Sequence, residues 1–225
     1  ISNNIVTGSN DGSKSDYGFY GQGNNAKVVI TGNVIDKTGD NPINFENQFG
    51  STSVTNNTIY ITANVDYNPY YSMVYTGTVS TPQIVEGNTF YLDHSGTGYA
   101  EAITFTTSPR GRWGGPVDDI GHYTAIQIKN NVINTGGPYA RGVGIYDRSQ
   151  GSGYGTITGA VITGNQIIGE HLLDDETYGV TLRGDVQGSV ITGNTINNVN
   201  IGAWIRPGED AGGTCPAASN DISYN

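Results

Sequence analysis

One short pattern of hydrophobic and polar positions recurs along the whole chain. It consists of an apolar residue, two spacer positions, an asparagine, a further spacer and a second apolar residue. Successive asparagines lie 24 to 43 residues apart, as expected for a coil that has a fixed core and loops of variable length. The copies occupy residues 1–6, 30–35, 54–59, 85–90, 128–133, 162–167 and 191–196, with a last partial copy at 222–225.

The residue before each asparagine is glycine or asparagine, except for Tyr224 in the last copy. These residue types tolerate a positive φ at low cost, so they predict a sharp bend between two strands. The asparagine side chains of successive coils can then form a ladder of hydrogen bonds along the stack. Ordinary hairpin turns in an antiparallel sandwich are the alternative, but hairpins favour Asn-Gly over the Gly-Asn found here. The ladder asparagines are Asn4, Asn33, Asn57, Asn88, Asn131, Asn165, Asn194 and Asn225.

A second alternating segment lies between successive asparagines, as a further strand of the same coil should. It is found at residues 18–22, 42–46, 102–106, 144–148, 179–183 and 202–206, and residues 73–76 fill the missing place. A period of two predicts that Phe19, Ile43, Ile103, Ile145 and Val180 point inward. The same period places Tyr20, Asn44, Thr104, Tyr146, Thr181 and Trp204 on the outside.

The composition supports strands and tight turns. Ile and Val number 23 and 17 against 4 Leu, and there are 34 Gly and 15 Tyr. The net charge is -10 and only 13% of residues are charged, which argues against a nucleic-acid binder with a broad basic face. No apolar run is long enough to insert into a membrane. The single Cys215 permits no internal disulfide, and the Tyr, Thr, Asn and Gly content is typical of an extracellular surface.

The repeated pattern resembles right-handed parallel β-helix proteins of the pectin-lyase-like superfamily. The resemblance extends over residues 1–225 and implies an all-β fold, a single solenoid domain of about seven to eight coils. It also implies an extracellular or cell- or virion-surface location, and a polysaccharide as partner. That superfamily includes polysaccharide lyases, C5-epimerases, polygalacturonases, phage tailspikes and non-catalytic surface proteins, so the reaction stays open.

The longest insertion, at residues 107–125, predicts a protruding loop. A polar loop on a rigid scaffold is a common place for binding or catalysis, although this one could instead cover a sheet edge. Its candidate residues for substrate binding are Arg110, Arg112 and Trp113, and His122 is a candidate base. Asp118-Asp119 followed by His122 is not enough to indicate a polygalacturonase, whose other motifs are absent.

Three arginines occupy equivalent positions in the alternating segment: Arg148, Arg183 and Arg206. On neighbouring coils they would repel one another, so an acidic partner such as Asp147, Asp185 or the run at 174–176, or a bound anion, is expected to compensate. With Trp204 they would suit a sugar carboxylate and a pyranose ring. A self-neutralised surface network is the alternative.

Asp147 is predicted at a position where the other coils carry apolar residues. A carboxylate there would have a raised pKa or a cationic partner, as acid–base catalysis requires, unless the register slips at this coil. For a lyase or epimerase, Tyr146, His122 or Asp147 is the candidate base. For a hydrolase, Asp147 would pair with Asp175 or with Asp174 or Asp185.

No cofactor is expected, with one weak exception. Residues 91–94, Tyr-Leu-Asp-His, resemble the Trp-Ile-Asp-His element of pectate lyases, in which the aspartate helps to bind calcium. The partner arginine motif of those enzymes is missing, and one aspartate is too few ligands for Ca²⁺. No metal ligands are therefore assigned.

Two functions from different classes follow. The first is an extracellular protein that acts on a glycan by lyase, epimerase or hydrolase chemistry, with a uronate-containing glycan as one candidate. The second is a non-catalytic adhesive module or filament subunit, because the chain begins and ends in the same phase of the repeat and both ends of the rod would be open sheet edges. That second reading predicts end-to-end association or a homo-oligomer, or a rod that forms part of a longer chain.

Overall fold

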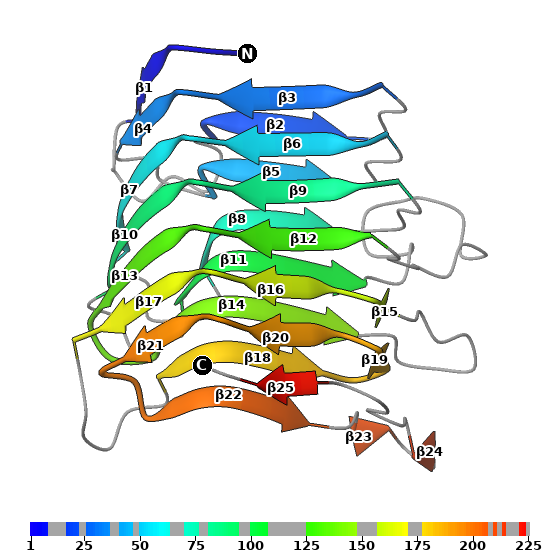
Figure 1. The fold of residues 1–225 in the computed structure, drawn as a ribbon. Helices are drawn as coiled ribbons and strands as arrows, with labels where there is room; N and C mark the ends of the chain where they lie inside the picture. Colours follow the sequence, from blue (N-terminus) through cyan, green and yellow to red (C-terminus); the bar gives the residue numbers. More distant parts are fainter. Residues whose placement is uncertain are drawn as a thin grey trace.

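The protein is a parallel β-helix of about seven coils, as shown by a computed structural model (Figure 1). The structure describes residues 1–8, 17–22, 26–36, 41–46, 50–63, 70–76, 81–94, 100–107, 125–147, 157–170, 177–206, 209–210, 213–214 and 221–223. Three parallel sheets of seven strands each run the length of the rod, and neighbouring strands within a sheet follow one another in chain order. The predicted fold class is therefore confirmed.

Each coil passes through the three sheets in turn. Sheet A holds the strands that lead into the asparagine turns: β3 (Val28–Thr31), β6 (Thr52–Thr55), β9 (Gln83–Glu86), β12 (Ile126–Lys129), β16 (Val161–Thr163), β20 (Val190–Thr192) and β25 (Asp221–Ser223). Sheet B holds the strands that leave those turns: β1 (Ile5–Thr7), β4 (Val34–Asp36), β7 (Thr58–Ala63), β10 (Thr89–His94), β13 (Val132–Gly136), β17 (Gln166–Gly169) and β21 (Thr195–Asn197).

Sheet C is formed by the second alternating segments of the sequence. Its strands are β2 (Phe19–Gln22), β5 (Ile43–Glu46), β8 (Tyr70–Thr76), β11 (Ala100–Thr107), β14 (Ala140–Asp147), β18 (Tyr178–Arg183) and β22 (Ile201–Arg206). Two short pairs complete the described strands, β15 (Ile157–Thr158) with β19 (Val186–Gln187) in parallel and β23 (Glu209–Asp210) with β24 (Gly213–Thr214) in antiparallel. Among the described residues, no helix is long and apolar enough to cross a membrane.

The interior is a stack of branched apolar side chains in register. On sheet A, Ile128 pairs with Val85 and Ile162, and on sheet B, Ile133 pairs with Phe90 and Ile167. All of these side chains are at most 1% exposed. Each such burial contributes about 1.5–3 kcal/mol relative to an exposed side chain, which explains why the rod needs no disulfide.

The asparagine ladder is present as predicted. The backbone N–H and the Nδ2 of Asn88 both donate to Oδ1 of Asn131, at 2.9 and 3.0 Å, and Asn131 does the same to Asn165. The same paired bonds link Asn4, Asn33, Asn57 and Asn88 in order, and Asn165 to Asn194. Asn225 lies outside the described residues. The bend residues before these asparagines have φ between 53° and 67°, as expected: Asn3, Gly32, Asn56, Gly87, Asn130, Gly164 and Gly193.

The register of sheet C at β14 differs from the prediction. The sequence alignment placed Ile145 beside Val180, whereas the structure pairs Val143 with Val180 and Ile145 with Leu182. The slip is two residues, so Ile145 still faces the core. The cause is the crowded position of Gly142, where a Cβ would lie 2.5 Å from the carbonyl oxygen of Gly179. Only glycine fits at this position. The sequence alignment had instead matched Gly144 with Gly179, and Gly144 lies two residues later in the chain.

This register selects one of the two alternatives for Asp147, the register slip, and overturns the predicted arginine column. Asp147 pairs with Thr107, beyond the last core position, so it does not occupy the apolar column that the alignment gave it. Tyr146 takes the place in register with Arg183 that was assigned to Arg148, and Arg148 itself lies outside the described residues. The predicted column of three equivalent arginines is therefore wrong.

The outer side of sheet C is also less open than its alternation suggested. Tyr20 is 49% exposed and Trp204 is half-buried, as outward positions should be. Four residues predicted to be outside are instead buried, namely Asn44, Thr104, Tyr146 and Thr181. The middle of this face is thus a second, polar interior, and it carries the candidate site.

Candidate functional site

The candidate site lies on the face of sheet C that is turned away from the apolar core, over strands β11, β14, β18 and β22. Three rows of in-register residues run across these strands. The first row is Glu101, Arg141, Tyr178 and Ile201; the second is Thr104, Gly144, Thr181 and Trp204; the third is Thr106, Tyr146, Arg183 and Arg206. Charged and aromatic side chains from four coils are therefore brought together at spacings of about 4.8 Å.

A local irregularity in each strand puts the first two rows on one face. Ala102 has no in-register partner, and both Ala102 and Ile103 belong to the apolar core. Glu101 and Thr104, although three residues apart, therefore point to the same side, where Thr104 Oγ1 donates to Glu101 Oε2 at 2.7 Å. Gly142 occupies the corresponding unpaired position on β14. Two consecutive residues therefore face the core in each strand. As a result, the charged residues just before them, Glu101 and Arg141, point to the outer face.

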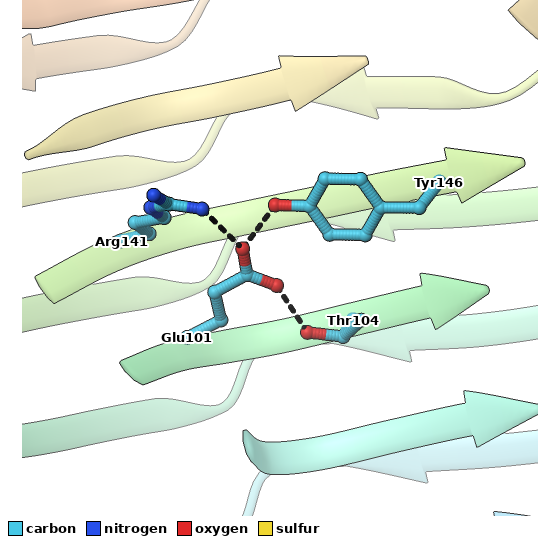
Figure 2. Close-up of polar contacts among 4 residues, drawn as sticks. All are labelled: Glu101, Thr104, Arg141 and Tyr146. Carbon is cyan, nitrogen blue, oxygen red and sulfur yellow. Dashed lines mark hydrogen bonds and ion pairs between the residues drawn. The ribbon is translucent and has the colours of Figure 1, made fainter. Parts of the chain in front are cut away.

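The carboxylate of Glu101 is the centre of a buried polar cluster (Figure 2). Its side chain is completely buried, and it accepts hydrogen bonds from the hydroxyl groups of Thr104 and Tyr146. Arg141 Nη1 lies 3.6 Å from Glu101 Oε1 and supplies the opposite charge. Two hydroxyl donors and one opposite charge thus compensate the loss of water around this carboxylate, which would otherwise be strongly unfavourable.

Gly144 makes the cluster possible by leaving room for the Tyr146 ring. A Cβ at position 144 would lie 2.4 Å from Tyr146 Cε2 and 2.5 Å from Glu101 Oε2. The ring folds back along its own strand over this glycine, and its hydroxyl group points toward Glu101 on the neighbouring strand (Figure 2). The hydroxyl is therefore committed to Glu101 and does not face solvent.

A stack of planar groups continues from this cluster toward the C-terminal coils. The Arg141 guanidinium lies 4.8 Å from the centroid of the Tyr178 ring, and Tyr178 stacks on Trp204 with 4.9 Å between ring centroids and 17° between planes. The guanidinium of Arg206 lies 5.5 Å from the Trp204 ring. Such cation–π and aromatic contacts stabilise the arrangement by about 0.5–2 kcal/mol each.

Exposure increases along the stack. Glu101 is completely buried and Arg141 is 9% exposed, whereas Trp204 and Arg206 are half-buried and Arg183 is exposed. Arg183 and Arg206 are in register, so their backbones are one coil apart. The accessible end of the face therefore carries two arginines and a tryptophan, although the protein as a whole is acidic.

Thr181 adds an unusual feature beside the stack. Its side chain is 1% exposed, and within the described ranges its hydroxyl oxygen has no hydrogen-bond partner. It lies between Gly144 and Trp204 in the second row. A buried hydroxyl without a partner costs about 1–3 kcal/mol, so this position favours a ligand or a water molecule that can bond to it.

The structure brings together only part of the predicted site. Tyr146, Arg183, Trp204 and Arg206 share one face. For Asp147, only the backbone at the end of β14 is described. The other candidates lie outside the described residues: Arg110, Arg112, Trp113, His122, Arg148, Asp174 and Asp175, together with most of the loop at 107–125.

The residues suggested for calcium lie elsewhere. Asp93 is an exposed side chain of β10 on sheet B, and it is not on the same sheet as the arginines. Within the part of the chain that the structure describes, no group of three or more His, Cys, Asp or Glu side chains is placed to hold a metal ion.

Three central residues of the site were not predicted: Glu101, Arg141 and Tyr178. A signal was present, because Tyr99-Ala100-Glu101 and Tyr139-Ala140-Arg141 repeat the same order with opposite charges. Aligning these two segments gives the observed pairing of Glu101 with Arg141.

Comparison of the chain with protein-family models, with curated proteins and with solved structures found no match.

Proposed function

We propose that this protein is an extracellular, polysaccharide-active β-helix that holds an anionic glycan against the exposed end of sheet C. The observation that carries the proposal is the in-register pair Arg183 and Arg206 beside the stacked ring of Trp204. The solenoid architecture and the sequence pattern also support kinship with right-handed pectin-lyase-like proteins. A uronate-containing polymer is the class of ligand that suits this surface.

Each of these side chains has a chemical counterpart on such a polymer. A guanidinium group binds a carboxylate through two parallel hydrogen bonds, and Arg183 and Arg206 offer two such groups on successive coils. Trp204 is half-buried, and the part of its ring that Tyr178 and Arg206 leave uncovered offers an apolar surface for a pyranose ring. A glycan that runs along the rod would then present successive carboxylates to successive coils.

The buried cluster limits which charges are available to the ligand. Glu101 neutralises the buried Arg141, so Arg183 and Arg206 are the arginines of this face that could meet a ligand. Tyr146 belongs to the same row as these two arginines, but its ring is only 4% exposed and its hydroxyl binds Glu101. Its role is to hold the row in place, and not to contact the glycan.

Catalysis by lyase, epimerase or hydrolase chemistry would need a base or a carboxylate pair next to the bound sugar. Of the predicted candidates, Asp147 is placed closest in the chain, at the end of β14 one residue after Tyr146. Binding and catalysis are therefore tested separately. Binding depends on described residues, and catalysis depends on Asp147, His122 and Asp175.

Binding is tested by calorimetric titration with polygalacturonate and alginate, and with an uncharged polymer for comparison. We expect the acidic polymers to bind and the Arg183→Gln/Arg206→Gln variant to lose this binding. Lys129→Gln, which removes a positive charge from sheet A, is the matched control and should bind normally. Failure of the wild-type protein to bind any acidic glycan would overturn the proposal, whereas binding without bond cleavage or epimerisation would restrict it to recognition.

A further inference from the structure

A hollow of about 320 Å³ lies on sheet B, away from the arginine face. Its lining comes from three successive strands, β7, β10 and β13, and from Glu170, the residue after β17, which corresponds to about 14 Å along the rod. This volume is at the lower end of the range for small-molecule sites, roughly 300–1,000 Å³. The lining residues are Tyr60, Ile61, Tyr91, Leu92, Asp93, Asn134, Gly136 and Glu170.

One side of the hollow is a pair of stacked tyrosines. Tyr60 and Tyr91 are in register on β7 and β10, with ring centroids 4.8 Å apart and only 5° between planes. Each side chain is 42% exposed, so much aromatic surface faces solvent on this sheet. The next residue in the row is the shorter Asn134, so the aromatic stack stops there and leaves one ring face of Tyr91 uncovered by a further aromatic side chain.

The other side is polar and negatively charged. Asp93 and Glu170 are exposed carboxylates, and Gly136 is in register with Asp93 between them. A Cβ at Gly136 would lie 3.1 Å from Glu170 Oε2 and 3.4 Å from the carbonyl oxygen of Leu92. The glycine therefore keeps open a space that any other residue would begin to fill.

These polar groups are not used by the fold. Within the described ranges, no hydrogen bond or ion pair involves the side chains of Asp93, Asn134 or Glu170. Two carboxylates and an amide offer acceptors and donors that match sugar hydroxyl groups. None of the lining residues that the structure describes is cationic, so their two carboxylates favour a negative potential in the hollow, which would repel an acidic sugar.

We infer that this hollow is a second glycan site, which binds a neutral oligosaccharide. The apolar face of one pyranose ring lies on Tyr91, and its hydroxyl groups bond to Asp93, Asn134 and Glu170. The inference is independent of the function proposed above, because it concerns a different sheet, the opposite charge and a different class of sugar. The protein would then link an acidic glycan on sheet C to a neutral one on sheet B.

The test is a calorimetric titration with neutral hexasaccharides of β-1,4-linked glucose, mannose and xylose, and of α-1,4-linked glucose. We expect at least one to bind to the wild-type protein. Tyr91→Leu, which keeps apolar bulk but removes the flat ring, should weaken that binding about tenfold or more, and Tyr91→Phe should retain it. Asp93→Asn/Glu170→Gln should weaken it as well, while leaving the tyrosine stack intact.

Several outcomes would overturn the inference. They are the absence of binding to every neutral probe, unchanged binding by Tyr91→Leu, and binding that is lost in Arg183→Gln/Arg206→Gln but not in the sheet B variants. A titration with Ca²⁺ alone adds another, because saturable calcium binding abolished by Asp93→Asn would assign the carboxylates to a cation. Unfolding temperatures of all variants are measured in parallel, so that a loss of folding is not mistaken for a loss of binding.

Discussion

The hydroxyl group of Tyr146 donates a hydrogen bond to the carboxylate of Glu101, a residue 45 positions earlier on the neighbouring coil. The contact exists because the tyrosine ring lies over Gly144 and extends back along its own strand (Figure 2). A polar cluster is thus built on the outer side of a sheet whose other side faces the apolar core. Its position next to Arg183 and Arg206 makes it the support of the proposed binding face.

Substitution of Gly144 by alanine should disrupt this support. The new methyl group would lie within 2.5 Å of both the Tyr146 ring and Glu101, in a fully buried place. Overpacking of this kind costs about 1–3 kcal/mol, so thermal unfolding should shift downward by several degrees. The change is measured by calorimetry or by circular dichroism.

Gly202→Ala is the matched control on the same sheet. A Cβ there has its nearest neighbour at 4.0 Å, and its φ is outside the left-handed region. Its stability should change by no more than about 0.5 kcal/mol. If the clash with the ring is the cause, Gly144→Ala combined with Tyr146→Ala will be less destabilised than the sum of the two single changes. Additive effects would contradict this explanation.

Removal of one asparagine from the middle of the ladder should destabilise the rod. Asn131→Ala leaves the backbone N–H of Asn88 without its acceptor and the carbonyl oxygen of Val85 without its donor. Each buried group left unsatisfied costs about 1–3 kcal/mol, so we expect a loss of about 3 kcal/mol in the free energy of unfolding, measured with urea.

Asn4→Ala is the corresponding change at the exposed end of the ladder. Asn4 donates to Asn33 as the other ladder residues do, but its surroundings are open to water, which can replace the lost bonds. The expected loss is below about 1 kcal/mol. Equal losses at Asn4 and Asn131 would show that burial of the ladder is not the source of its stability.

The coils could be predicted well from the sequence because each coil carries one marker residue, the ladder asparagine. An asparagine such as Asn131 occurs once per coil, after a residue with a required positive φ, so the alignment has a single phase. The alternating segment of sheet C lacks such a marker. A strand with period two matches its neighbour equally well after a shift of two residues, which is how Asp147 was misplaced.

The correct register depends on contacts that only the fold brings together. Gly142 must lie against the carbonyl oxygen of Gly179, and Gly179 in turn lies against that of Gly202. Glu101 and Arg141 were missed for a related reason. They come before the irregular step in each strand, outside the segment in which alternation was considered, and their pairing joins coils 40 residues apart.

Tyr20 should titrate at unusually high pH. Loss of solvent around the phenol, followed by its hydrogen bond to Glu46 at 2.9 Å and the charge of that carboxylate, raises the pKa of Tyr20 from 10.0 to about 12. Because the folded state favours the neutral phenol, its stabilising contribution is complete below pH 10 and is lost as the pH rises through about 12. The titration is followed by NMR of protein labelled at the tyrosine ring, with Tyr20→Phe to assign the signal.

Glu46→Gln separates the effect of burial on the pKa of Tyr20 from the effect of the Glu46 carboxylate. Removal of the carboxylate should lower the pKa of Tyr20, but not fully to 10.0, since burial makes the largest contribution. A return to the ordinary value would mean that Glu46 alone is responsible.

Arg183 and Arg206 should make glycan binding sensitive to salt, whereas Trp204 should not. Added salt shortens the screening length from about 10 Å at 0.1 M to about 3 Å at 1 M, so the attraction between a polyuronate and Arg183 or Arg206 weakens. Trp204→Ala should reduce affinity by a similar factor at both salt concentrations, because stacking on a sugar ring involves no net charge. Arg206→Gln should reduce affinity strongly at low salt and little at high salt. Titrations of the wild type, Trp204→Ala and Arg206→Gln at both salt concentrations give this comparison. A loss of glycan affinity in Arg206→Gln that does not depend on salt would contradict the prediction. It would mean that the guanidinium supports the Trp204 ring, 5.5 Å away, and does not bind the carboxylate.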